Sequence, residues 1–168
     1  PFIHETSWLC DYELLTDELC ALIGAVLAAL PDNAGDIRQD LEQLQPLVFH
    51  ANGSVRGRLA LQEADLEWLK TRLHDYRRRL VSPPKGFVLP RGSAPVPQLH
   101  AVRSCCKKTI RALVRVSEEG REVDDILPRF LNLLCNVSFT LTLLFNQQRD
   151  EPETGFTSHS YGPVKPSR

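Results

Sequence analysis

Residues 82–104 read SPPKGFVLPRGSAPVPQLHAVRS and divide the chain into two parts. Five prolines fall within residues 82–97, and because proline removes a backbone donor and breaks helices, this stretch is not helical. Pro97 suits the first turn of a helix, which we expect over residues 97–117. A connection of this length in a compact domain is an ordered loop or a functional one.

Three helices are expected before this connection. Residues 10–30, CDYELLTDELCALIGAVLAAL, repeat apolar side chains at three- and four-residue steps, and Pro31 ends the pattern. A second apolar stripe covers residues 36–51. A third covers residues 62–80, where acidic residues at the start and the arginines of YRRRL at the end suit the helix dipole.

A fifth helix is expected over residues 125–147. Its segment 131–145, LNLLCNVSFTLTLLF, carries no charge but is shorter than the roughly 20 residues that span a membrane, so we expect a core helix and no membrane span. Because no alternating strand pattern occurs, we predict an all-α fold, a five-helix up-down bundle. We place this bundle at residues 10–147, between an N-terminal extension (1–9) and a polar C-terminal tail (148–168).

Composition limits the classes of function. The net charge is −1, so the chain does not attract polyanions through its overall field, and any phosphate site must be local. The basic runs DYRRRL and CCKK leave contact with RNA open. Five cysteines without regular spacing make no disulfide framework and fit an intracellular or organellar protein. Methionine is absent, so we expect the chain to be processed or to begin downstream of its translated start.

The segment RSCCKKTIR, residues 103–111, concentrates positive charge on the fourth expected helix. Arg103, Lys107 and Arg111 follow one another at four-residue steps and therefore stack on one side, with Lys108 adjacent. The pattern fits a polyphosphate site, a protein interface or a solvated basic face.

Three other features place polar or aromatic groups beside apolar stretches. Asp17 adjoins the apolar stripe of the first helix and needs a cation or solvent. Phe87 lies between turn residues, and it either anchors the loop or faces a ligand. Asn132 and Asn136 lie one turn apart in the apolar fifth helix, where we expect buried amides with structural partners. The five histidines have no ligand spacing, so we expect no metal site.

Four segments fall in the order and spacing of a known family. They read CDYELLTDELCALIGAV, LEQLQPLVFHANGSV, LEWLKTRLHDYRRRLVSPPKGFVLPRGSAPVPQLHAVRSCCKKTIRALV and FLNLLCNVSFTLTLLF. Over residues 10–147 the chain resembles the PduO-type ATP:cob(I)alamin adenosyltransferases, and KGFVLPRGSAPVPQLHAVRS is the best-matching piece. The resemblance implies a five-helix bundle and a trimer with active sites between subunits. It also implies transfer of the adenosyl group of ATP to reduced cobalamin with Mg²⁺.

The resemblance assigns roles to individual positions. It makes Phe87 the aromatic wedge against the corrinoid, and it pairs Asp17 with Arg103 across a subunit contact. The positions that correspond to the nucleotide site are Arg103, Lys107, Lys108, Arg111, Asn132 and Asn136.

Several of these positions depart from the family pattern. The phosphate-binding motif R-x-x-x-R-R-x-E-R is RSCCKKTIR here, so Lys107 and Lys108 lack the guanidinium fork and Ile110 lacks the carboxylate. The motif N-R-x-S-D is NLLCN at residues 132–136, which replaces Arg, Ser and Asp. The Thr- and Gly-rich loop Y-T-x-x-G-D-x-G-x-T has no counterpart in residues 1–9, PFIHETSWL.

Catalysis by several preorganised charges acting together fails when many of them are lost. We therefore expect a pseudoenzyme with no confident catalytic residue, serving as a structural or interaction subunit of a larger assembly or as a homotrimer. Because members of the family are frequently mitochondrial, the resemblance implies the mitochondrion as the expected location. The alternative is a divergent active adenosyltransferase or a corrinoid-binding protein. We expect no cofactor for a pseudoenzyme, and ATP, Mg²⁺ and cobalamin for an active enzyme.

Overall fold

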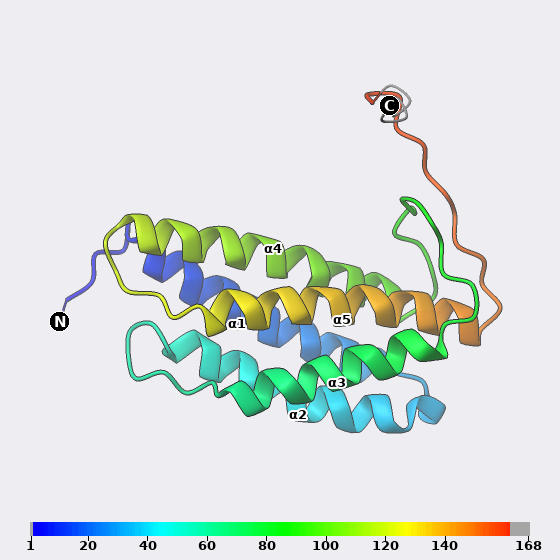
Figure 1. Ribbon diagram of the computed structural model, residues 1–168, viewed down its shortest axis with the longest axis horizontal. Helices are drawn as coiled ribbons and strands as arrows, with labels where there is room; N and C mark the ends of the chain where they lie inside the picture. Colours follow the sequence, from blue (N-terminus) through cyan, green and yellow to red (C-terminus); the bar gives the residue numbers. More distant parts are fainter. Residues whose placement is uncertain (1, 162–168) are drawn as a thin grey trace, which may run out of the picture.

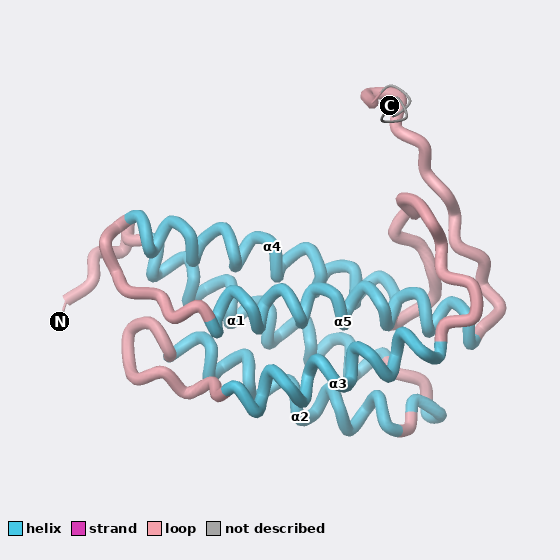
Figure 2. The backbone as a smooth tube through the Cα atoms, viewed as in Figure 1, coloured by secondary structure: helices cyan, strands magenta, loops and turns pink. Residues whose placement is uncertain are grey.

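The computed structural model describes residues 2–161 and contains five long α-helices (Figure 1). Their bounds are α1 Trp8–Ala29, α2 Asp36–Gly53, α3 Glu63–Arg79, α4 Val96–Glu118 and α5 Ile126–Gln148, with a short 3-10 helix at Asp32–Ala34. Consecutive helices run in opposite directions (Figure 1). Figure 2 shows helices and loops and no strand in the described part of the chain. The predicted all-α, five-helix up-down bundle is therefore confirmed.

The helices close into a ring around one apolar core. α4 packs between α1 and α5, α1 packs against α2, and α3 packs against α5. Of all helices within residues 2–161, only α5 is long and apolar enough to cross a membrane, but 67% of its most apolar window is buried inside the bundle. This burial is expected of a core helix.

The first helix begins at Trp8, two residues earlier than its apolar pattern suggests. The Ser7 hydroxyl caps it by accepting a hydrogen bond from the backbone of Leu9 at 3.2 Å. The carboxylate of Glu119, at the end of α4, accepts from the Ser7 hydroxyl at 2.9 Å and from the Trp8 backbone at 3.0 Å. The guanidinium of Arg115 stacks over the Trp8 ring at 4.1 Å. The start of α1 is therefore bound to the end of α4.

The contact between α2 and α3 is the sparsest in the ring, and polar groups hold it together. The buried Tyr76 donates its hydroxyl to Asp40, while Arg79 pairs with Asp36 and, at 2.5 Å, with Asp75. The hydrogen bond from Arg79 holds the pKa of Asp36 below its usual range. Burial, and then the Asp40 carboxylate, raises the pKa of Tyr76. Of the three arginines that end α3, Arg79 therefore already has carboxylate partners.

Candidate functional site

A cavity of about 570 Å³ lies between the connection before α4 and the facing sides of α4 and α5. We call residues 85–95 the Phe87 loop and this space the Phe87 cavity. Its lining residues are Lys85, Gly86, Phe87, Val88, His100, Arg103, Cys135, Asn136 and Phe139. The fold thus brings three of the predicted site residues, Phe87, Arg103 and Asn136, to one place.

Phe87 is unusual for an aromatic residue because 79% of it is exposed. It does not anchor the loop, since an anchoring ring would be buried in the bundle. Together with Val88 and Phe139 it gives the cavity an apolar wall. Apolar walls with a few converging polar groups are typical of small-molecule sites.

His100 supplies one of these polar groups, and our sequence reasoning treated it as structural only. It is 7% exposed, and its Nδ1 accepts a hydrogen bond from the Arg103 Nε at 3.4 Å. Its Nε2 is buried without a hydrogen-bond partner. Burial and, to a smaller extent, the charge of Arg103 lower the pKa of His100, so the ring is neutral at neutral pH. The sequence motif that could have pointed to His100 as a site residue is Leu-His-x-x-Arg at residues 99–103.

The other predicted cations do not reach this cavity. Lys107 donates to Asn132 on α5 at 3.3 Å, whereas Lys108 pairs with Glu18 on α1 at 3.3 Å. Arg111 lines, together with Lys108 and Glu18, a groove of about 420 Å³ between α1 and α4 that is separate from the Phe87 cavity. The basic stripe of α4 therefore divides among three neighbourhoods, because each four-residue step advances about 40° around a helix.

Our expectation for the two asparagines of the fifth helix was wrong. Asn132 and Asn136 are both exposed, and neither is a buried amide. The helix packs on two neighbours but leaves one narrow side open, and both amides lie on that side. Asn136 consequently lines the Phe87 cavity, and Asn132 meets Lys107.

Asp17 and Arg103 form no ion pair within the described part of one chain. Asp17 is exposed on α1, and Arg103 is partly buried at the Phe87 cavity. A pair across a contact between two subunits remains a prediction.

The cavity is poor in groups that hold metals or act as nucleophiles. None of its lining residues carries a carboxylate, and residues 2–161 contain no group of three His, Cys, Asp or Glu side chains placed to bind a metal ion. The Cys135 thiol is buried and donates to the Arg103 carbonyl at 3.7 Å. Burial and, to a smaller extent, Cys135 raise the pKa of the buried Cys106, so this thiol stays protonated at neutral pH.

The first part of the expected C-terminal tail is attached to the Phe87 loop. Val88 and Gly155 form an antiparallel β-bridge, in which the Leu89 backbone donates to Thr154 at 2.8 Å and the Phe156 backbone donates to Phe87 at 2.8 Å. Sequence reasoning missed this contact. Residues 162–168 of the expected tail lie outside the described residues.

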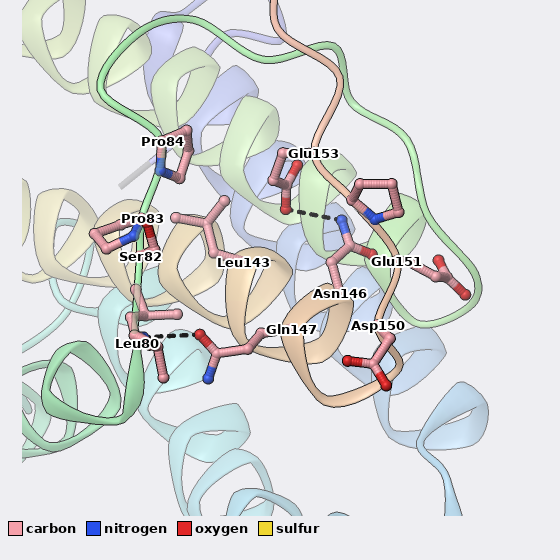
Figure 3. A pocket seen from close by; sticks show the side chains of 12 residues that line it. Leu80, Ser82, Pro83, Pro84, Leu143, Asn146, Gln147, Asp150, Glu151 and Glu153 are labelled. Atoms are coloured by element: carbon pink, nitrogen blue, oxygen red, sulfur yellow. Dashed lines mark hydrogen bonds between the residues drawn. The ribbon is translucent and has the colours of Figure 1, made fainter.

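A second hollow, of about 360 Å³, lies at the end of α5, between the segment 80–84 and residues 150–153 (Figure 3). The segment 80–84, with its two prolines, faces residues 150–153 across the last turn of α5. Gln147 accepts a hydrogen bond from the Val81 backbone at 2.9 Å, and Asn146 donates to Glu153 at 2.9 Å. These bonds fasten both segments to α5.

Comparison with known proteins identifies the class to which this bundle and cavity belong. Residues 15–145 match the family described as cobalamin adenosyltransferase. The chain is 31% identical over 133 residues to a cobalamin adenosyltransferase from Cupriavidus metallidurans, a match that covers 78% of this chain and 71% of that protein. It is 28% identical over 137 residues to a corrinoid adenosyltransferase from Bacillus subtilis, covering 77% and 70% of the two chains. The chain belongs to the cobalamin adenosyltransferase family.

A solved structure agrees with this assignment at the level of the fold. The bundle is similar to a variant of the PduO-type ATP:corrinoid adenosyltransferase from Lactobacillus reuteri complexed with cobalamin and ATP, with a TM-score of 0.83 at 19% identity. The match covers 93% of this chain and 90% of that chain.

Proposed function

We propose that this chain is a non-catalytic member of its family that acts by binding, as a subunit of a larger assembly. One observation carries the proposal. The Phe87 cavity keeps an apolar wall and one arginine, whereas its lining contains no carboxylate. Transfer of an adenosyl group from ATP requires charges that hold both the triphosphate and Mg²⁺, and Mg²⁺ is bound through oxygen ligands, most often carboxylates.

The cations of α4 give further support. Lys107 and Lys108 stand where the resembling family has arginines, and a lysine grips phosphate as a point charge rather than through a two-pronged fork. Lys108 is also engaged by Glu18 at 3.3 Å, so a triphosphate there would compete with a carboxylate of the same chain.

The test is an adenosylation assay with ATP, Mg²⁺ and chemically reduced cobalamin. The Bacillus subtilis relative is the positive control under the same conditions. We expect adenosylcobalamin to form no faster than in the same reaction without protein. Turnover that Arg103→Ala abolishes would contradict the proposal and favour a divergent active enzyme.

A second candidate function, corrinoid binding without transfer, is favoured by the exposure of Phe87. A ring that is 79% exposed beside an apolar cavity offers a flat surface to a large planar ligand. Equilibrium dialysis against cob(II)alamin tests this candidate, with Phe87→Ala as the variant that should lose binding. Val81→Ala is a matched control, because Val81 is 86% exposed and does not line this cavity.

Partners and location are proposals that rest on the resemblance. A homotrimer and a subunit of a mixed, mitochondrial complex both agree with a family that builds its site between subunits. Light scattering of the pure chain separates a stable trimer from a chain that needs partners, and mass spectrometry of a native purification identifies those partners. Contact with RNA has less support, since Arg79 and Lys108 of the two basic runs already pair with carboxylates.

A further inference from the structure

The Phe87 loop carries the wall of the candidate site but has few apolar anchors, since Pro95 at its end is its one buried residue. Phe87 is 79% exposed, and the loop contains no helix or strand before α4 begins at Val96. An exposed loop with prolines and glycines is expected to be mobile unless other segments hold it. The groups that hold this loop are therefore of interest.

Within residues 2–161, all of the long-range hydrogen bonds that hold the loop come from the end of α5 and the segment after it. At one edge, the β-bridge joins Val88 to Gly155. At the other edge, the carboxylate of Glu151 accepts from the Ser93 backbone at 2.9 Å and from its hydroxyl at 2.5 Å. The Glu151 carboxylate has a lowered pKa because of these two hydrogen bonds. The loop is thus held at both ends by one short segment.

Between these edges, Asn146 occupies the centre of the contact. It is 2% exposed and donates to the Arg91 carbonyl at 3.1 Å and to Glu153 at 2.9 Å. Its side chain thereby links the loop directly to the C-terminal segment. Arg149 adds a hydrogen bond from its guanidinium to the Ala94 carbonyl.

We propose that residues 151–156 form a strap that sets the position of Phe87 and, through it, the affinity of the Phe87 cavity for its ligand. The effect of the strap on affinity rests on the proposed corrinoid binding. Its role in holding the Phe87 loop in place does not depend on that proposal. The backbone N–H of Phe156 donates to the carbonyl of Phe87 itself, so the strap acts on the backbone of the residue that forms the wall. Because this bond is made by the backbone, its effect can be separated from that of the Phe156 ring.

The experiment compares three variants of the full chain by amide hydrogen exchange. Phe156→Pro removes the donor, Phe156→Ala removes the ring but keeps the donor, and Thr157→Pro places the same proline one residue further along. The amide of Leu89 is the reporter, because it donates across the bridge to Thr154 at 2.8 Å. Losing one hydrogen bond should make local opening of the bridge, which exposes the Leu89 amide to exchange, about five- to tenfold more frequent.

We therefore expect Phe156→Pro to raise the exchange rate of the Leu89 amide about five- to tenfold, with Phe156→Ala and Thr157→Pro close to the wild type. We expect the same proline variant to weaken cob(II)alamin binding, measured by equilibrium dialysis, by a similar factor. Exchange within α5 should be unchanged in all variants, which shows that the bundle is intact.

Each outcome decides a separate point. An unchanged exchange rate in Phe156→Pro would overturn the strap. Faster exchange with an unchanged cobalamin affinity would overturn the link between the strap and the ligand. A wild-type chain that binds no cobalamin would contradict the proposed corrinoid binding, while the exchange rates would still decide whether the strap holds the loop.

Discussion

The two regions to which the sequence assigned site residues, the Phe87 loop and the basic stripe of α4, are built in different ways. The loop is held by backbone hydrogen bonds and by the buried side chain of Asn146. Apart from the partly buried Arg103, the stripe consists of exposed side chains, and its members contact different neighbours, Lys107 meeting Asn132 and Lys108 meeting Glu18. The loop backbone is therefore tied to the bundle by hydrogen bonds, whereas most of the stripe lies on the surface.

This difference agrees with two of the departures from the pattern that the chain resembles, those at the exposed Lys107 and Lys108. A change at an exposed side chain usually alters stability by no more than about 0.5 kcal/mol, so the exposed positions of the stripe can change at little cost to the fold. A side chain added at Gly92 in the loop, by contrast, would meet the buried Asn146 and Val96.

The largest effect should come from Gly92 in the loop. Gly92 has a φ of +153°, and a Cβ there would lie 2.3 Å from the Asn146 Oδ1 and 2.9 Å from the side chain of Val96. We expect Gly92→Ala to lower the free energy of unfolding by about 3 kcal/mol. Urea unfolding measures the change. Gly86→Ala is the matched control, since a Cβ at Gly86 meets nothing within 4 Å; equal stability of both variants would contradict the view that the loop is part of the core.

The next effect concerns a pair that would join the two parts of the site across a subunit contact. If Asp17 of one copy meets Arg103 of another, the single variants Asp17→Ala and Arg103→Ala should weaken assembly, and the double variant should add little. We expect a coupling energy of about 1–3 kcal/mol from such a cycle, measured by analytical ultracentrifugation. Additive effects, or a monomeric wild-type chain, would refute the pair.

A smaller effect is expected from His100, which borders both parts. Its pKa is lowered in the folded chain, by burial first and then by Arg103, so the unfolded chain binds the proton more readily. Stability is therefore complete above a pH of about 6.5 and is lost as the pH falls through the lowered pKa of the folded chain. We expect His100→Gln to flatten the fall in melting temperature between about pH 7 and pH 5. The exposed His74, changed to Gln, should leave the slope unchanged, and a slope that survives in His100→Gln would count against this cause.

The smallest effect should come from the stripe itself. Lys108 and Glu18 have side chains that are 53% and 46% exposed, so their ion pair is well solvated. We expect Lys107→Ala and Lys108→Ala each to change the free energy of unfolding by less than about 0.5 kcal/mol. A loss above about 1 kcal/mol in urea unfolding would remove the distinction between the stripe and the loop.

Periodicity of apolar residues was sufficient to predict the first three helices, whereas Pro97 and the uncharged run of residues 131–145 indicated the last two. It was insufficient at the ends: Ser7 caps α1, but its partner Glu119 is distant in sequence. The exposure of Asn132 and Asn136 was missed because an apolar helix gives no sign of which narrow side its neighbours leave open.

Part of the candidate site was predicted as well. Phe87, Arg103 and Asn136 do meet at one cavity, and the resemblance, not the periodicity, brought them together. The attachment of the C-terminal segment could not be predicted in this way. A single β-bridge involves too few residues to leave an alternating pattern, and the polar, Gly- and Pro-containing sequence around it is typical of a tail.

The cap of α1 by Glu119 has a consequence for the order in which the chain folds. The carboxylate meets Ser7 and Trp8, which lie 112 and 111 positions earlier in the sequence. Closing so large a loop is entropically unfavourable until the intervening helices have docked, so this contact should be absent from the folding transition state. Substitution of Glu119 by Gln should then accelerate unfolding while leaving the refolding rate nearly unchanged, a split that stopped-flow measurements in urea resolve directly.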